Sequence, residues 1–229
     1  NTTHYRIPTP EQVAKWCAAV PDDFRFCPKV PQRISHERNL GLGGDQLPLF
    51  WEALRHFGEQ LGCCFVQLPP YFGADHLPLL CKWLDIWPTD FPLAVELRHE
   101  SWFTDQAVVA RWAEVLRKSG VAAVITDVAG RRDVLHQVVT APRTMIRFVG
   151  NGLHATDYER ADDWLGKLTE WQERGLQQVY FFPHQPDNEL APEMALYLVN
   201  AWHAAKSVHI RGPHKLGPKS AGGEQITLF

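Results

Sequence analysis

The sequence has little of what marks a membrane protein or a disulfide-bonded protein. None of its apolar runs approaches the ~20 residues of a transmembrane helix, and no signal peptide opens it. The five cysteines are odd in number and lack paired CxxC spacing, and the adjacent Cys63 and Cys64 fit small buried hydrophobes. We therefore expect no zinc site or disulfide framework, and a cytoplasmic protein that does not bind membranes.

Charge imbalance and glycine-rich phosphate loops are also missing. The net charge is −3, from 23 basic and 26 acidic residues, which predicts no strong whole-molecule attraction to nucleic acid but leaves a local patch open. Neither GxGxxG nor GxxxxGK[ST] occurs, which argues against a nucleotide-binding sheet. What is present is 229 residues with 45% hydrophobic content, enough for one large α/β domain.

Short β-rich runs alternate with helical patterns, which predicts βαβ units and a parallel sheet. The expected strands are 24–30, 63–70, 92–99, 122–127, 144–150 and 177–184, with "NTTHYR" as the end of another. The expected helices are 10–19, 46–60, 75–86, 104–119, 159–174 and 189–206, with Thr104 as an N-cap. The segment between 127 and 144 is short and Arg-rich, so its helix is expected to be degenerate.

This order favours a TIM-like (β/α) barrel over 1–206, followed by a flexible tail over 207–229 that is rich in Gly, Pro and Lys. A closed TIM barrel has eight strands, and the sequence supplies fewer. Either a first strand lies upstream of Asn1, or the barrel is open on one side.

Polar side chains recur where the predicted strands end. Strand alternation in "AVELRH" puts Glu96 and Arg98 on one face and Val95 and Leu97 on the other. Other strands end in the same way, with Lys29, Gln67, Asp127, Arg147 and His184. Barrel enzymes build their sites at the carboxyl ends of the strands, so these residues predict a ligand-binding rim.

Each residue type at this rim suggests a role. Glu96 and Asp127 are candidates for general acid and base, with His184 as a third catalytic group. The excess of cations suits phosphate or carboxylate, so the predicted substrate-binding residues are Lys29, Gln67, Arg98, His99, Trp102 and Arg147.

Structural readings of the same residues stay open. A salt-bridge layer could pair Glu96 with Arg98 or Arg147, and Asp127 with Lys29. Trp102 could equally be a packing plug. A divalent metal held by Glu96, Asp127 and His184 is weakly supported, since no tight ligand spacing such as HExxH occurs.

Three stretches carry a family resemblance. "ELRHESW", together with "FRFCPKVPQRISH" and "FVQLPP", resembles the YecE-like family, the domain of unknown function numbered 72. The resemblance extends to about residue 205 and implies a TIM-like barrel, but no reaction or substrate. The chain departs from the family pattern at Val149, where a histidine is usual, and at Pro183 and His184, which replace an Asn-Asn pair. It also starts after the strand that usually carries a Gly-Thr-Ser-Gly-Trp-like motif.

The chain ends in "QITLF", which resembles the short peptide by which bacterial DNA polymerases dock on the sliding clamp. Gln225 would fill a polar subsite, and Leu228 and Phe229 would anchor in an apolar cleft. A chance apolar terminus explains the pattern equally well. The leading hypothesis is a hydrolase that binds a phosphate-bearing substrate in DNA metabolism. The alternatives are a non-catalytic adaptor and a sugar or sugar-acid isomerase or lyase.

Overall fold

The computed structural model describes residues 2–130, 133–204 and 210–213. The chain divides into two compact units. The first comprises Asn1–Val149 and Gln172–Phe182, and the second comprises Gly150–Trp171 and Pro183–Phe229. Each unit is treated by itself below.

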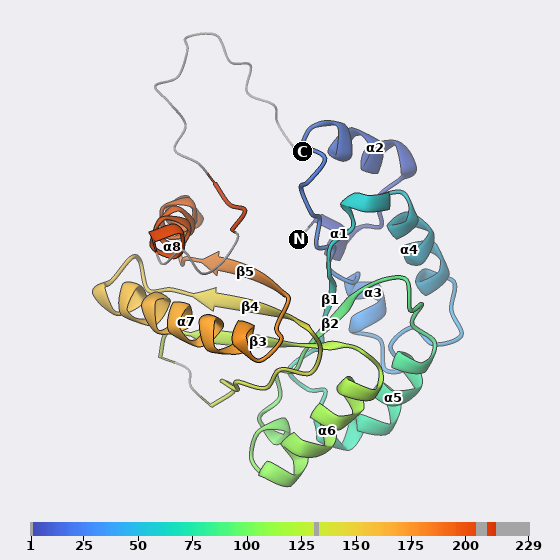
Figure 1. The fold of residues 1–229 in the computed structure, drawn as a ribbon. Helices are drawn as coiled ribbons and strands as arrows, with labels where there is room; N and C mark the ends of the chain where they lie inside the picture. The colour runs from blue at the N-terminus through green and yellow to red at the C-terminus, as the bar shows by residue number, and fades with distance from the viewer. Residues whose placement is uncertain (1, 131–132, 205–209, 214–229) are drawn as a thin grey trace. The chain divides into compact units, whose positions relative to one another are not determined.

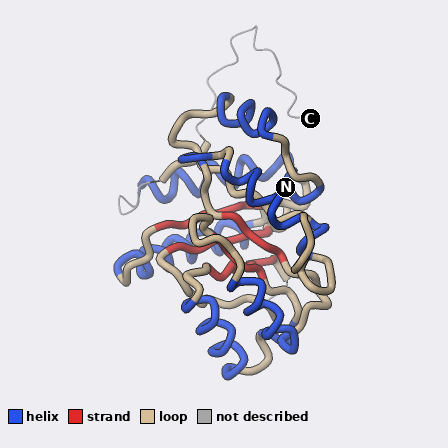
Figure 2. The backbone as a smooth tube through the Cα atoms, turned by 90° about the vertical axis from the view of Figure 1, so that its right-hand side faces the viewer, coloured by secondary structure: helices blue, strands red, loops and turns tan. Residues whose placement is uncertain are grey.

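The strands form one five-stranded sheet in the order β1-β2-β3-β4-β5 (Figures 1 and 2). They are β1 (Cys64–Gln67), β2 (Leu93–Glu96), β3 (Ala122–Val128), β4 (Arg143–Val149) and β5 (Gln178–His184). Neighbouring strands from β1 to β4 are parallel. The α/β class is thus confirmed, and five of the expected strands form. The sixth, at 24–30, makes only isolated parallel bridges, from Phe26 to Leu61 and from Lys29 to Phe65.

Helices alternate with the strands. They are α1 (Thr2–Tyr5), α2 (Pro10–Ala18), α3 (Gln32–Ser35), α4 (Gln46–Arg55), α5 (Leu77–Asp85), α6 (Gln106–Lys118), α7 (Ala155–Glu173) and α8 (Ala191–Ala204). Short 3-10 turns are η1 (Gly58–Gln60), η2 (Ala74–His76), η3 (Glu100–Trp102) and η4 (Asn188–Leu190). None of the described residues between β3 and β4 is helical, as the Arg-rich segment predicted. No described helix is both long and apolar enough to span a bilayer.

Two local predictions are wrong. "NTTHYR" holds the helical turn α1 and no strand, because Thr3 turns its hydroxyl to the backbone of Lys29 and so fixes the turn. Helix α6 is capped by Asp105 rather than Thr104, since the Asp105 carboxylate accepts the Ala107 N–H. Either residue type can cap a helix, so composition alone did not separate the two neighbours.

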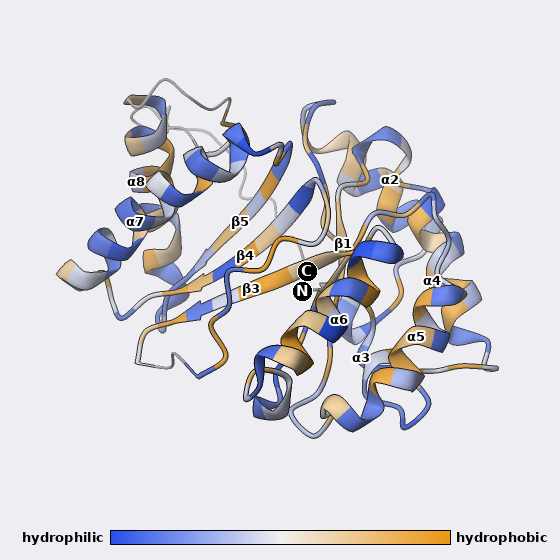
Figure 3. Cartoon of the chain, turned by 60° about the horizontal axis from the view of Figure 1, so that its bottom comes forward, coloured by the Kyte–Doolittle hydropathy of each residue, from blue (hydrophilic) through white to orange (hydrophobic). Residues whose placement is uncertain are grey.

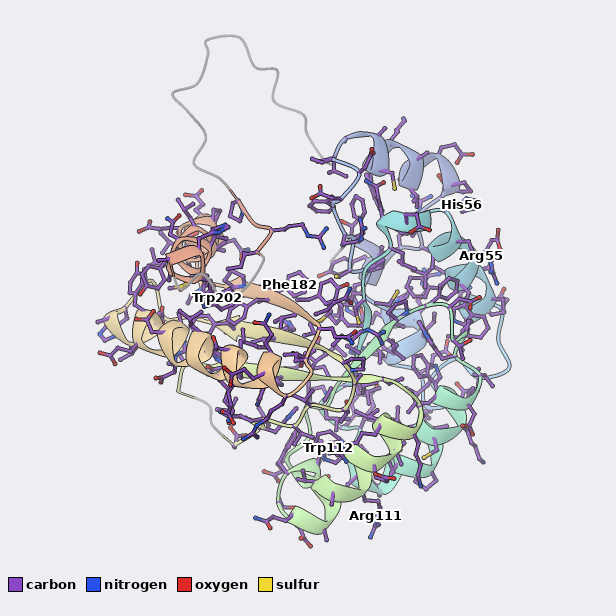
Figure 4. All side chains as sticks on the ribbon, viewed as in Figure 1. Arg55, His56, Arg111, Trp112, Phe182 and Trp202 are labelled. Carbon is purple, nitrogen blue, oxygen red and sulfur yellow. The ribbon has the colours of Figure 1, made fainter. Side chains whose placement is uncertain are left out.

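The first unit buries apolar side chains on both faces of its strands. One face, with Val66, Val95 and Ala123, packs in a large cluster with residues of α4, α5 and α6. On α6, Trp112 is buried in this cluster, whereas Arg111 beside it is exposed (Figure 4). The strands themselves are mostly apolar (Figure 3). This face follows from helix and strand periodicity.

The opposite face of the strands carries a smaller apolar cluster, which we call the inner face. Its members are Cys63, Phe65, Ala94, Ala122, Val124 and Met145. All of them precede the last residues of their strands. Because side chains alternate, the next residues on this face come two positions later, toward the carboxyl ends of the strands.

The second unit is built on α8 and most of α7. Tyr158 and Tyr197 meet edge to face, with ring centroids 4.7 Å apart, and the Tyr197 hydroxyl donates to Asp162 at 2.9 Å. Asp157 and Gln185 are buried polar residues of this unit. They are hydrogen-bonded to each other, from Gln185 Nε2 to an Asp157 carboxylate oxygen at 3.5 Å.

Candidate functional site

The inner face turns polar toward the carboxyl ends of β1 to β4. Gln67 lies two positions after Phe65 and pairs in register with Glu96, which lies two positions after Ala94. Thr126 likewise follows Val124 and pairs with Arg147. Alternation therefore brings Gln67, Glu96, Thr126 and Arg147 to one face, as the sequence predicted for all but Thr126.

A continuous hydrogen-bonded chain links these side chains. The Lys29 ammonium donates to Gln67 Oε1 at 2.9 Å, and Gln67 Nε2 donates to Glu96 Oε1 at 2.7 Å. Arg147 donates to both oxygens of Glu96, at 2.9 and 2.8 Å. The Glu96 side chain is 2% exposed and that of Arg147 20%. Of the two predicted partners for Glu96, Arg147 is thus the one that pairs with it.

Cations outnumber the carboxylate in this group. Arg98 follows β2, is exposed, and makes no hydrogen bond or ion pair with any residue that the structure describes. Burial lowers the pKa of Lys29; Glu96 opposes this effect, whereas the charges of Arg147 and Arg98 add to it. Lys29, Arg98 and Arg147 are therefore three cationic side chains around one buried carboxylate, Glu96, which forms its ion pair with Arg147.

The Thr126 hydroxyl lies on the same face without a partner. Its oxygen is buried and has no hydrogen-bond partner among the described residues. In register it stands beside Arg147. A buried hydroxyl normally finds a partner, so this group is suited to contact a ligand.

Asp127 lies on the other face of the sheet. It follows Ala123 and Ile125 in the alternation of β3, and Ala123 belongs to the cluster that packs on the helices. Asp127 is buried, and it has an interaction partner of its own. The prediction that Asp127 shares a face with Glu96 placed the alternation of β3 one residue out. A shift of one residue moves a side chain to the opposite face of the sheet.

Trp102 and His99 have structural environments. Trp102 is fully buried, donates its indole N–H to the Phe72 carbonyl at 2.7 Å and stacks on Phe72. Of its two predicted roles, the structure has the packing plug. His99 caps η3, with Nδ1 accepting the Ser101 N–H at 3.1 Å. The Trp102 indole nitrogen and His99 Nδ1 are therefore both engaged in hydrogen bonds within the protein.

The remaining predicted residues are His184 and three residues of the C-terminal peptide. His184 ends β5 and belongs to the second unit, where its carbonyl accepts the Gly150 N–H at 2.9 Å. Gln225, Leu228 and Phe229 lie outside the described residues. Among the residues with described positions, no group of three or more His, Cys, Asp or Glu side chains could hold a metal ion.

Two histidines join the polar group without having been predicted. His4 lies in α1 and His36 follows α3, and the charge of Lys29 acts on both rings. Neither residue ends a strand, so the strand-end rule could not find them. His36 does close the stretch "FRFCPKVPQRISH" that carries the family resemblance.

A cavity of about 520 Å³ opens elsewhere in the first unit. Half of the residues that line it are prolines or aliphatic residues, and its charged residues are Arg6, Arg33 and Glu52, with His56 beside them. None of the rim residues predicted from the sequence lines it. Its size suits a small molecule, but its chemistry is separate from that of the Lys29–Arg147 chain.

Comparison with known proteins places the chain in a family. The family model for proteins of unknown function DUF72 matches residues 1–218. The UPF0759 protein YecE of Escherichia coli (strain K12) is 34% identical over 212 residues, which cover 85% of this chain and 77% of that protein.

Solved structures of similar fold carry the same family name. A DUF72 family protein from Enterococcus faecalis V583 has a TM-score of 0.73 at 24% identity, covering 88% of this chain and 87% of that one. A DUF72 family protein from Thermotoga maritima MSB8 has a TM-score of 0.61 at 21% identity, covering 89% and 81%. The ELRH and SW residues thus resembled the right family, and this chain belongs to DUF72, a family of proteins of unknown function.

Proposed function

We propose that this protein binds a small phosphate- or carboxylate-bearing anion on the inner face, at the carboxyl ends of β1 to β4. The observation that carries the proposal is the surplus of positive charge around Glu96. Lys29 and Arg147 are both linked to this one carboxylate, and Arg98 has no acidic partner among the described residues. An anion would supply the missing charge.

The side chains take different parts in this binding. Arg98 is exposed and holds the anion through its guanidinium, which can donate two parallel hydrogen bonds. Lys29 adds charge from the side of Gln67, and the Thr126 hydroxyl offers a further hydrogen bond. Glu96 does not contact the anion itself, because both of its oxygens already accept hydrogen bonds from Arg147.

The fold supports this location. In a TIM-like barrel the loops after the strands build the site, and the sheet order here is that of consecutive barrel strands. We infer that the five strands belong to such a barrel. Phosphate sites are frequent at this end of the fold, which favours a phosphate-bearing ligand over a simple carboxylate.

The class of reaction is a weaker proposal. A hydrolase acting on a phosphate-bearing substrate remains our leading hypothesis, and recruitment to DNA by a sliding clamp rests on the prediction for Gln225, Leu228 and Phe229 alone. A sugar-phosphate isomerase or lyase would use the same anion site. A purely structural adaptor is disfavoured, since it has no need for the unpaired Arg98.

Calorimetric titration with inorganic phosphate tests the binding proposal. Arg98→Ala should weaken binding about tenfold or more, because a charge-assisted hydrogen-bonded pair is lost. Its stability should change by no more than about 0.5 kcal/mol, as for other exposed positions. Arg111→Ala is the matched control, since Arg111 is exposed on α6. Equal affinities for the wild type and Arg98→Ala, or no binding by the wild type, would refute the proposal.

A further inference from the structure

His4 and His36 form a pair beside the Lys29 backbone. Their ring centroids are 5.9 Å apart at an interplanar angle of 61°. Helix α1 is fixed there by Thr3, whose hydroxyl donates to the Lys29 carbonyl at 2.8 Å and accepts the Lys29 N–H at 2.9 Å. His36 is held through its carbonyl, which accepts the Tyr71 hydroxyl at 2.8 Å. Thr3 therefore ties the helix that carries His4 to the Lys29 backbone, and Tyr71 ties down the backbone of His36.

The hydrogen bonds of the two rings determine which nitrogen carries the proton. His4 Nδ1 lies 3.3 Å from the Val30 carbonyl, which can only accept, so Nδ1 is the protonated nitrogen. His36 Nδ1 lies 3.0 Å from the Ser35 hydroxyl, which itself donates to the Pro31 carbonyl at 3.3 Å. The Ser35 oxygen consequently accepts from His36. In both neutral rings Nε2 holds the free lone pair.

The electrostatic surroundings favour the neutral form of both rings while no anion is bound. Burial lowers the pKa of His36, and the charges of Lys29 and Arg98 lower it further. Burial also lowers the pKa of His4; its hydrogen bond to Val30 opposes this, and Lys29 and His36 add to the lowering. Neither ring forms an ion pair with a carboxylate among the described residues. Each would gain a proton more readily beside a bound negative charge.

We propose that His4 and His36 extend the anion site into a subsite for a dianion, which binds together with protons taken up on their Nε2 atoms. This inference rests on the proposed function, because Lys29 and Arg98 are common to both. Each proton comes from solvent, and no bond in the ligand breaks or forms. The ligand class is a phosphate monoester or another group with two negative charges.

Sulfate is the probe that isolates this effect, because it stays a dianion from pH 5 to pH 8. Calorimetric titration of the full chain should show sulfate affinity rising about tenfold between pH 8 and pH 6, as a ring with a lowered pKa becomes protonated beside the anion. The linked uptake of protons should appear as a dependence of the binding enthalpy on the ionisation enthalpy of the buffer.

Two variants test which groups take up the protons. His36→Gln should reduce the change in affinity between pH 8 and pH 6 to less than about threefold, because the neutral amide cannot be protonated in this range. His4→Gln should reduce it as well. His56→Gln is the matched control, since His56 is exposed on the surface near Glu52 and should keep the full dependence.

The outcomes separate this inference from the proposed function. No sulfate binding by the wild type at any pH would refute both. Binding that does not depend on pH would refute only the role of the histidines. A dependence on pH that persists in both His36→Gln and His4→Gln would assign the proton uptake to other groups and would overturn the subsite. Arg98→Ala should weaken binding at every pH and keep the slope.

Discussion

Two buried carboxylates in this protein have similar partners but different surroundings. Asp157, in the second unit, is 0% exposed and pairs with Arg160 at 3.1 Å, while also accepting the Asn151 N–H at 2.7 Å. Glu96, in the first unit, is 2% exposed and pairs with Arg147 at 2.8 Å. Each also meets a glutamine amide, Gln185 or Gln67.

The difference lies in what surrounds each pair. Arg160 follows Asp157 by one helical turn, and the Gln185 side-chain oxygen accepts the Gly152 N–H at 2.9 Å, so this group closes a loop onto a helix. The Glu96 group instead spans side chains from separate strands and includes Lys29, and nearby Arg98 has no acidic partner among the described residues. A buried carboxylate with one local cation is sufficient for structure, whereas one among several cations indicates a binding site.

The largest expected effect is on the stability of the second unit. Asp157→Ala should lower the free energy of unfolding by about 3–5 kcal/mol, because it removes the buried carboxylate that accepts hydrogen bonds from the Arg160 side chain and the Asn151 N–H. Urea denaturation measures the loss. Phosphate affinity of the folded variant should equal that of the wild type, and a weakened affinity would show that the two networks do not have separate roles.

A second contrast concerns two histidines. His136 is half-buried between Phe103 and Trp112, and its removal from solvent lowers its pKa to about 4. The unfolded chain, with a histidine pKa near 6.5, takes up this proton first as the pH falls. His136 therefore stabilises the protein fully above pH 6.5, and this contribution is lost progressively between pH 6.5 and pH 4, by about 3 kcal/mol in all.

Urea denaturation at several pH values would measure that slope. His36→Gln should lose only a small part of the slope, because the pKa of His36 is lowered less than that of His136, whereas His136→Gln should lose most of it. Equal slopes in the two variants would contradict the assignment of a structural role to His136.

Of the effects on stability expected for Asp157, His136 and Glu96, the smallest should come from Glu96→Gln. We expect a loss of about 2 kcal/mol, below that for Asp157→Ala, because Arg147 is partly exposed and solvent can screen its unpaired charge. Phosphate affinity should rise several-fold, since the only carboxylate in the cationic group is removed. Calorimetry on the variant measures this, and weaker binding would mean that Glu96 is needed to hold Arg147 in place.

The sheet could be predicted because its strands are short apolar runs between clear turn signals. Each of the runs at 63–70, 92–99, 122–127, 144–150 and 177–184 overlaps an observed strand. The run at 24–30 forms bridges only. The six residues at the start were too few to show a period, and a tertiary contact of Thr3 decided their conformation.

The site was predicted in part, and the errors in that prediction have physical causes. Alternation placed Glu96, Gln67 and Arg147 on one face, but the frame of alternation in β3 could not be read from a run in which every residue but Thr126 and Asp127 is apolar. Thr126 therefore stands where Asp127 was expected. His4 and His36 could not be found by periodicity, because both reach the site from short helical turns.

The most direct test of the anion site is to locate a bound anion in crystals of the protein. Crystals soaked in tungstate, an electron-dense analogue of phosphate, would give an anomalous signal at each bound anion. We expect a signal in contact with Arg98 and Lys29, within reach of Nε2 of His36. Signal confined to Arg6 and Arg33 at the cavity, with none at Arg98, would contradict it.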